Sequence, residues 1–123
     1  MEVIDHEHQP LEEWCAGVMT RMRVSAITGA GQLCLFEHFC EPGKGAPTHL
    51  HTVEEVLTVL DGKAEIWVGD ERTTLTTGQS MVVPAGRLPT KRLTRSAVEH
   101  SRYRRKVVWA MGAELCPLWK TLP

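Results

Sequence analysis

Two histidines and a glutamate in the middle of the chain have the types and the spacing of metal ligands. His49 and His51 are separated by one residue, and Glu55 follows shortly after them. Alternate residues of a β-strand project from the same face, so both imidazoles could reach one cation while Leu50 points away. Two neutral imidazoles and one carboxylate suit Fe, Mn, Ni, Cu or Zn and leave coordination positions open for substrate, water or oxygen. These three residues are therefore the candidate metal site.

A lone H-x-H pair is more often a polar surface feature than a metal site, but this pair belongs to a longer pattern. Residues 43–62 read G-x5-H-x-H-x3-E-x6-G, with glycines at both ends of the ligand segment. A second pattern, G-x5-P-x-G, begins at Gly78, includes Pro84 and Gly86, and belongs to a segment over residues 78–90. The two patterns, in this order, resemble the two conserved motifs of the cupin superfamily.

The resemblance implies a cupin jelly-roll β-barrel of antiparallel strands, with a metal ion at its mouth. The two histidines and the glutamate of the first motif would hold the ion, together with a further histidine in the second motif. In this chain that position falls on Pro89, or on Thr90 if one residue is inserted, and neither side chain can replace an imidazole.

Three arrangements remain open at this departure from the family pattern. The site has three protein ligands and more water, or it recruits a ligand from elsewhere, or the barrel holds no metal. We rank the three-ligand site first. His38 and His100 are the candidates for recruitment, and Cys40 ranks behind them.

The chain of 123 residues has room for one domain, which we take to be a single barrel over 1–123 with an N-terminal arm over 1–16. Alternating apolar residues and turn signals predict an all-β fold with little helix. The expected strands are 18–25, 33–40, 56–60, 64–68, 73–77, 80–83 and 106–111. A short helical turn is expected over residues 10–16. Asp61 and Gly62 predict that strands 56–60 and 64–68 pair as a hairpin.

Composition excludes several classes of protein. No apolar run approaches the ~20 residues of a membrane helix, and the first residues have no secretory pattern. The four cysteines, Cys15, Cys34, Cys40 and Cys116, show no C-x-x-C pair, so we expect reduced thiols. These features predict a cytoplasmic protein without a membrane partner.

Basic residues are concentrated in one late segment, residues 91–106, which holds half of the 14 Lys and Arg of the chain. Nucleic-acid binding is disfavoured, because the sequence has no helix-turn-helix pattern and only Tyr103 could stack on a base nearby. In cupins the segment after P-x-G borders the barrel mouth. Lys91 and Arg92 are therefore candidate substrate contacts, and we expect an anionic small molecule as the ligand.

An outward tryptophan suggests a second copy of the chain as a partner. The expected inward set is Ala64, Ile66 and Val68, which leaves Trp67 on the outer face of its strand. Residues 113–120 are also rich in apolar side chains. Both features predict a homodimer.

The function expected from these residues is that of a metal-dependent cupin enzyme acting on a small polar or aromatic molecule. The resemblance leaves the reaction open among dioxygenase, isomerase, decarboxylase, cyclase and lyase chemistry, and it assigns no catalytic residue. The alternative is a non-catalytic ligand-binding or sensor cupin with weak or no metal, because the second-motif histidine is missing. The short chain and the intact H-x-H and Glu55 argue against a purely structural barrel.

Overall fold

The protein is built from antiparallel strands with almost no helix, as predicted. The computed structural model describes residues 1–45, 53–85, 94–98 and 105–112. Nine strands and one short 3-10 helix, η1, lie in these ranges. They are β1 (Glu12–Cys15), β2 (Val18–Val24), η1 (Ala26–Thr28), β3 (Leu33–Cys40), β4 (Glu55–Asp61), β5 (Lys63–Val68), β6 (Glu71–Thr76), β7 (Gln79–Val83), β8 (Thr94–Val98) and β9 (Arg105–Gly112).

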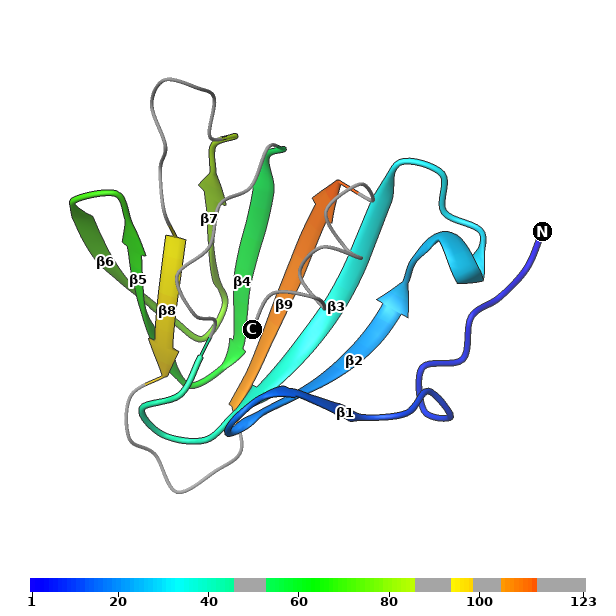
Figure 1. Cartoon of the computed structure of the whole chain (residues 1–123), viewed down its shortest axis with the longest axis horizontal. Coiled ribbons are helices and arrows are strands. Elements are labelled where there is room, and N and C mark those ends of the chain that lie inside the picture. The colour runs from blue at the N-terminus through cyan, green and yellow to red at the C-terminus, as the bar shows by residue number, and fades with distance from the viewer. Residues whose placement is uncertain (46–52, 86–93, 99–104, 113–123) are drawn as a thin grey trace.

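The strands form two sheets. The larger has the order β1-β2-β3-β9-β4-β7, and the smaller has the order β6-β5-β8. In Figure 1 the smaller sheet stands beside the β7 end of the larger one, and β6 contacts both β4 and β7. Within the described residues each sheet ends in edge strands, so the backbone ladder does not run around a closed barrel.

The hairpin expected at Asp61 and Gly62 is wrong. Strand β4 pairs with β7 and β9, whereas β5 pairs with β6 and β8. Gly62 has a φ of 106° and its amide donates to Thr77 Oγ1 at 2.9 Å. The pair of turn residues therefore makes a corner at which the chain passes from the larger sheet to the smaller one.

Two further differences from the prediction concern β1 and β8. The helical turn expected over residues 10–16 is instead strand β1, which pairs with β2 through Glu12↔Thr20 and Glu13↔Met19. Strand β8 lies in the basic segment, where no strand was predicted. In the described ranges no helix is long and apolar enough to span a membrane.

The core lies on the inner faces of both sheets and includes residues from β2 to β7. Its members are Val18, Cys34, Phe36, Cys40, Leu57, Val59, Ala64, Ile66, Val68, Leu75 and Val83. The prediction that Ala64, Ile66 and Val68 point inward is confirmed. Trp67 is half-buried on the opposite face of β5, and the homodimer inferred from it stays a prediction.

The expectation of reduced thiols is wrong for Cys34. Cys34 is disulfide-bonded, whereas Cys15 and Cys40 are free thiols, so neither of these two is its partner. Burial, together with the proximity of Cys15, raises the pKa of Cys40 to about 12. The Cys40 thiol therefore stays protonated at neutral pH.

Candidate metal centre

Glu55 is the one predicted metal ligand that lies within the described residues. It is the first residue of β4, and its side chain is fully buried. Leu57 and Val59, its alternate neighbours on the strand, are also fully buried, whereas Val56 and Leu60 are exposed. The period of two along β4 therefore turns the carboxylate inward, on the same face as the core.

The surroundings of Glu55 fit the ligand role. Its cross-strand neighbours are Val83 on β7 and Met111 on β9, and neither residue type carries a charge. A carboxylate removed from water is costly unless a hydrogen-bond donor, a cation or a metal compensates its charge. A buried carboxylate that faces the core at the start of β4 is compatible with the role of a metal ligand.

The other two predicted ligands, His49 and His51, lie outside the described residues. So do His100, Pro89, Thr90, Lys91 and Arg92, and the roles predicted for all of these stay predictions. Within the described ranges no group of three His, Cys, Asp or Glu could hold a metal ion. A three-ligand site that includes Glu55 therefore needs His49 and His51. Both lie in residues 46–52, between β3 and β4 in the sequence.

His38 was considered as a recruited ligand, and the structure places it inside the core. It is almost fully buried on the inner face of β3. Its Nδ1 lies 2.7 Å from Thr20 Oγ1 on β2. The imidazole packs edge-on against Phe36 and Trp14, with ring centroids 5.0 and 5.9 Å apart. The inward alternation of β2, visible in the sequence, could have indicated Thr20 as its partner.

The strand register separates His38 from Glu55. His38 is opposite Val107, and Val107 is opposite Val59 on β4. Val59 lies four residues beyond Glu55, which corresponds to about 13 Å along a strand. An imidazole and a carboxylate so far apart do not bind the same ion. The register thus argues against His38 as a ligand of an ion held by Glu55, and Cys40 lies farther along the same strand.

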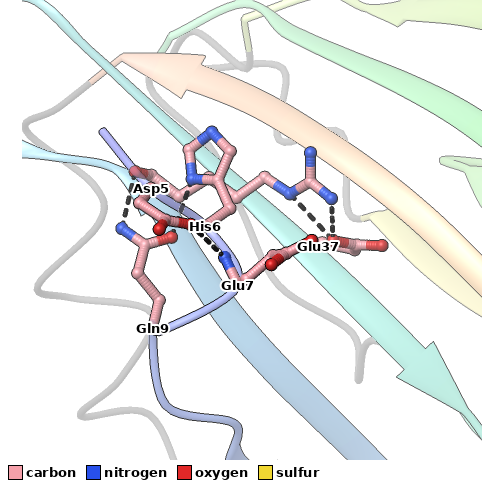
Figure 2. A network of polar contacts seen from close by, with 6 residues as sticks. Asp5, His6, Glu7, Gln9 and Glu37 are labelled. Atoms are coloured by element: carbon pink, nitrogen blue, oxygen red, sulfur yellow. Dashed lines mark hydrogen bonds and ion pairs between the residues drawn. The ribbon is translucent and has the colours of Figure 1, made fainter. Parts of the chain in front are cut away.

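A second fully buried glutamate, on the other face of the larger sheet, was not singled out from the sequence. Arg23 on β2 donates from its Nε to Glu37 Oε2 on β3 at 2.8 Å, and its terminal nitrogen also contacts this oxygen. Figure 2 shows this pair beside the N-terminal arm. Gln9 of the arm donates to the Arg23 carbonyl oxygen at 3.0 Å. The side-chain oxygen of Gln9 is hydrogen-bonded to His6 Nδ1. The charge of Glu37 is thus compensated by the fold.

A family model described as the cupin domain matches residues 36–89, which include both sequence motifs as far as Pro89. The sequence resemblance is therefore confirmed over this segment, and the fold is cupin-like. No curated protein matches this chain in sequence.

Solved structures show the same fold. KdgF from Halomonas sp. is 12% identical with a TM-score of 0.75, and the match covers 91% of this chain and 94% of that chain. An RmlC-like cupin from Shewanella frigidimarina is 18% identical, with a TM-score of 0.71 and 92% of each chain covered. Oxalate decarboxylase from Bacillus subtilis, which has Mn(II) centres, is 15% identical with a TM-score of 0.69; the match covers 91% of this chain and 30% of that chain.

Proposed function

We propose that this cupin is a metal-dependent enzyme that acts on a small molecule, with the ion held by His49, His51 and Glu55. The observation that carries the proposal is the fully buried, inward-facing carboxylate of Glu55 at the start of β4. This is the residue that the H-x-H-x3-E pattern assigns to metal binding. The Mn(II) centres of the structurally similar oxalate decarboxylase support the choice of a transition metal.

The ligand set determines what chemistry is accessible. A divalent ion of Fe, Mn, Ni, Cu or Zn, when bound, would polarise a carbonyl group of the substrate or admit dioxygen. Three protein ligands leave room for two substrate oxygens. Leu57, on the same face of β4, and Val83, opposite Glu55, are buried and give the proposed site apolar neighbours. Lys91 and Arg92 would attract an anionic substrate.

A second candidate function is favoured by the departure in the second motif. Pro89 and Thr90 occupy the positions at which the family has a further histidine, so the ion would lose one imidazole. A cupin with weak or no metal would bind a small ligand without transforming it, as a binding module or sensor. Metal content separates the two candidates.

The test is the metal content of protein purified without chelator or nickel resin. The wild type should hold about one transition metal per chain, and His49→Ala and His51→Ala should hold none, because two remaining ligands do not retain an ion against dilution. His8→Ala, which removes an exposed histidine of the N-terminal arm, is the matched control and should keep the metal.

The outcomes distinguish the candidates. Metal retained by the two variants would place the site elsewhere in the chain. A wild type that takes up no metal at any concentration would favour the binding module. Where metal is present, spectra in air and under nitrogen separate a redox-active ion from zinc, and hence oxygen chemistry from lyase, isomerase or hydrolytic chemistry.

A further inference from the structure

The turn between β1 and β2 contacts the turn that follows β3. The amide of Glu41 donates to the carbonyl oxygen of Gly17 at 2.8 Å. The thiol of Cys15 donates to the carbonyl oxygen of Gly45, with sulfur and oxygen 3.8 Å apart. These two contacts join the ends of the turn over residues 41–45 to the end of β1 and to the turn that follows it.

Gly17 fits this contact only because it has no side chain. Its φ is +78°, and a Cβ there would lie 2.5 Å from Lys44 Cγ and 3.1 Å from Lys44 Cβ. A rotation about the Lys44 Cα–Cβ bond would move Cγ away, but Cβ is bonded to the backbone and can retreat only if the turn moves. At Gly29, Gly43, Gly69 and Gly78, which also have positive φ, a Cβ would meet nothing within 4 Å. The close approach at Gly17 is therefore distinct from the ordinary demand of a left-handed turn.

The turn over 41–45 leads directly into the segment that contains the two predicted histidine ligands. Gly45 immediately precedes residues 46–52, and His49 and His51 lie within that segment. A displacement of Lys44 or Gly45 would pass along the chain toward both histidines. We call the contacts that Cys15 and Gly17 make with residues 41–45 the seat. Among the described residues, these contacts lie nearest to the start of the ligand segment.

We infer that Cys15 and Gly17 are positioning residues for metal binding: they hold the start of the histidine-bearing segment without touching the ion. This inference rests on the proposed function, and it names two residues outside both cupin motifs. Groups that orient metal ligands from outside the coordination shell commonly change metal affinity by roughly 10- to 100-fold when they are altered.

The main test compares two alanine variants in the full-length protein. Gly17→Ala should weaken metal binding by roughly tenfold in competition against a calibrated chelator. Gly69→Ala is the matched control, because Gly69 also has a left-handed φ, of +60°, but lies in the β5–β6 turn with open space around it. Both variants should lose stability through backbone strain, and only Gly17→Ala should lose metal affinity.

A rescue variant separates positioning from a general loss of stability. Lys44→Ala removes the Cγ atom that lies closest to the added methyl group and leaves the Cβ contact at 3.1 Å. The double variant Gly17→Ala/Lys44→Ala should recover most of the metal affinity. If Gly17→Ala does not fold, Cys15→Ala carries the test, since it removes only the thiol donor and should weaken metal binding severalfold.

Amide hydrogen exchange makes the result independent of the proposed enzyme. In metal-free protein, the peptide over residues 41–53 should exchange severalfold faster in Gly17→Ala than in Gly69→Ala. If the wild type holds no metal and this difference is present, the proposed function fails but the seat is confirmed. Equal chelator competition and equal exchange in the two variants would overturn the inference.

Discussion

The larger sheet buries one glutamate on each of its faces, and the two carboxylates have different surroundings. Glu37 lies on the outer face of β3 and Glu55 on the inner face of β4, and both side chains are fully excluded from solvent. Glu37 is held by Arg23 from the adjacent strand. The cross-strand neighbours of Glu55 are Val83 and Met111.

The difference indicates two roles for the same residue type. A carboxylate that the neighbouring strand neutralises contributes to structure, because its cation is part of the same sheet. Glu55 lies at the start of a strand, just after the H-x-H segment, and we propose that it shares a cation with that segment. Changes at the two glutamates should therefore affect different measured quantities.

The largest expected effect is the loss of stability when the Arg23–Glu37 ion pair on the outer face of the larger sheet is broken. Arg23→Ala should lower the free energy of unfolding by about 2–3 kcal/mol, because it leaves the Glu37 carboxylate buried without its cation. The value lies toward the lower end for buried pairs because the Arg23 side chain is 27% exposed. Urea denaturation measures the loss, and metal affinity should not change.

The control for this prediction is an ion pair of the smaller sheet. Arg72 Nε lies 3.2 Å from Glu65 Oε1, but the Arg72 side chain is 64% exposed. Arg72→Ala should therefore cost less than about 1 kcal/mol. Equal losses in Arg23→Ala and Arg72→Ala would remove the structural role assigned to Glu37.

The next effect compares the same substitution at the two glutamates. Glu55→Gln removes the charge of a proposed ligand and should weaken metal binding by roughly tenfold or more, since altering even outer groups costs about that much. Glu37→Gln should leave metal affinity unchanged and lower stability instead. Metal affinity is measured on both variants by chelator competition, and stability by urea denaturation. The comparison is contradicted if metal affinity and stability change together.

The smallest effect sharpens the site at the inner face. Thr90→His, or Pro89→His if no residue is inserted, should tighten metal binding by up to about tenfold, which corresponds to about 1.4 kcal/mol. The reason is that an added imidazole would replace a water ligand. Thr74→His on exposed β6 is the control. The absence of tightening in both Thr90→His and Pro89→His would mean that this segment does not reach the ion.

Local sequence patterns predicted much of this fold. Turn signals on both sides located β3 with the bounds that the structure has, and alternation assigned the inward face of β5 correctly through Ala64, Ile66 and Val68. Both results depend on which side chains face the core, and that information is local. The all-β class follows from the same alternation, repeated between turn signals.

The errors arose where distant parts of the chain decide the outcome. Asp61 and Gly62 have the residue types of a hairpin turn, but β4 pairs with β9 and β7 instead of with β5. Within residues 10–16, Glu12–Cys15 form a strand because they pair with β2. The burial of Glu37 could not be foreseen from β3, because it requires Arg23 on another strand. For the site, the sequence identified Glu55 as a ligand candidate, but only the register showed how far His38 lies from it.

The position of β9 has a consequence for how the molecule assembles. This strand lies between β3 and β4, so the N-terminal half of the larger sheet and the strand that carries Glu55 are joined through it. Every ladder contact of β9 links residues far apart in sequence, as in Cys34↔Met111 and Glu55↔Met111. Such long-range pairings close large loops and form slowly. During synthesis on the ribosome, the β1-β2-β3 part and the β4-β7 part of the larger sheet can join only after β9 emerges, so the proposed metal site at Glu55 would be completed late in folding.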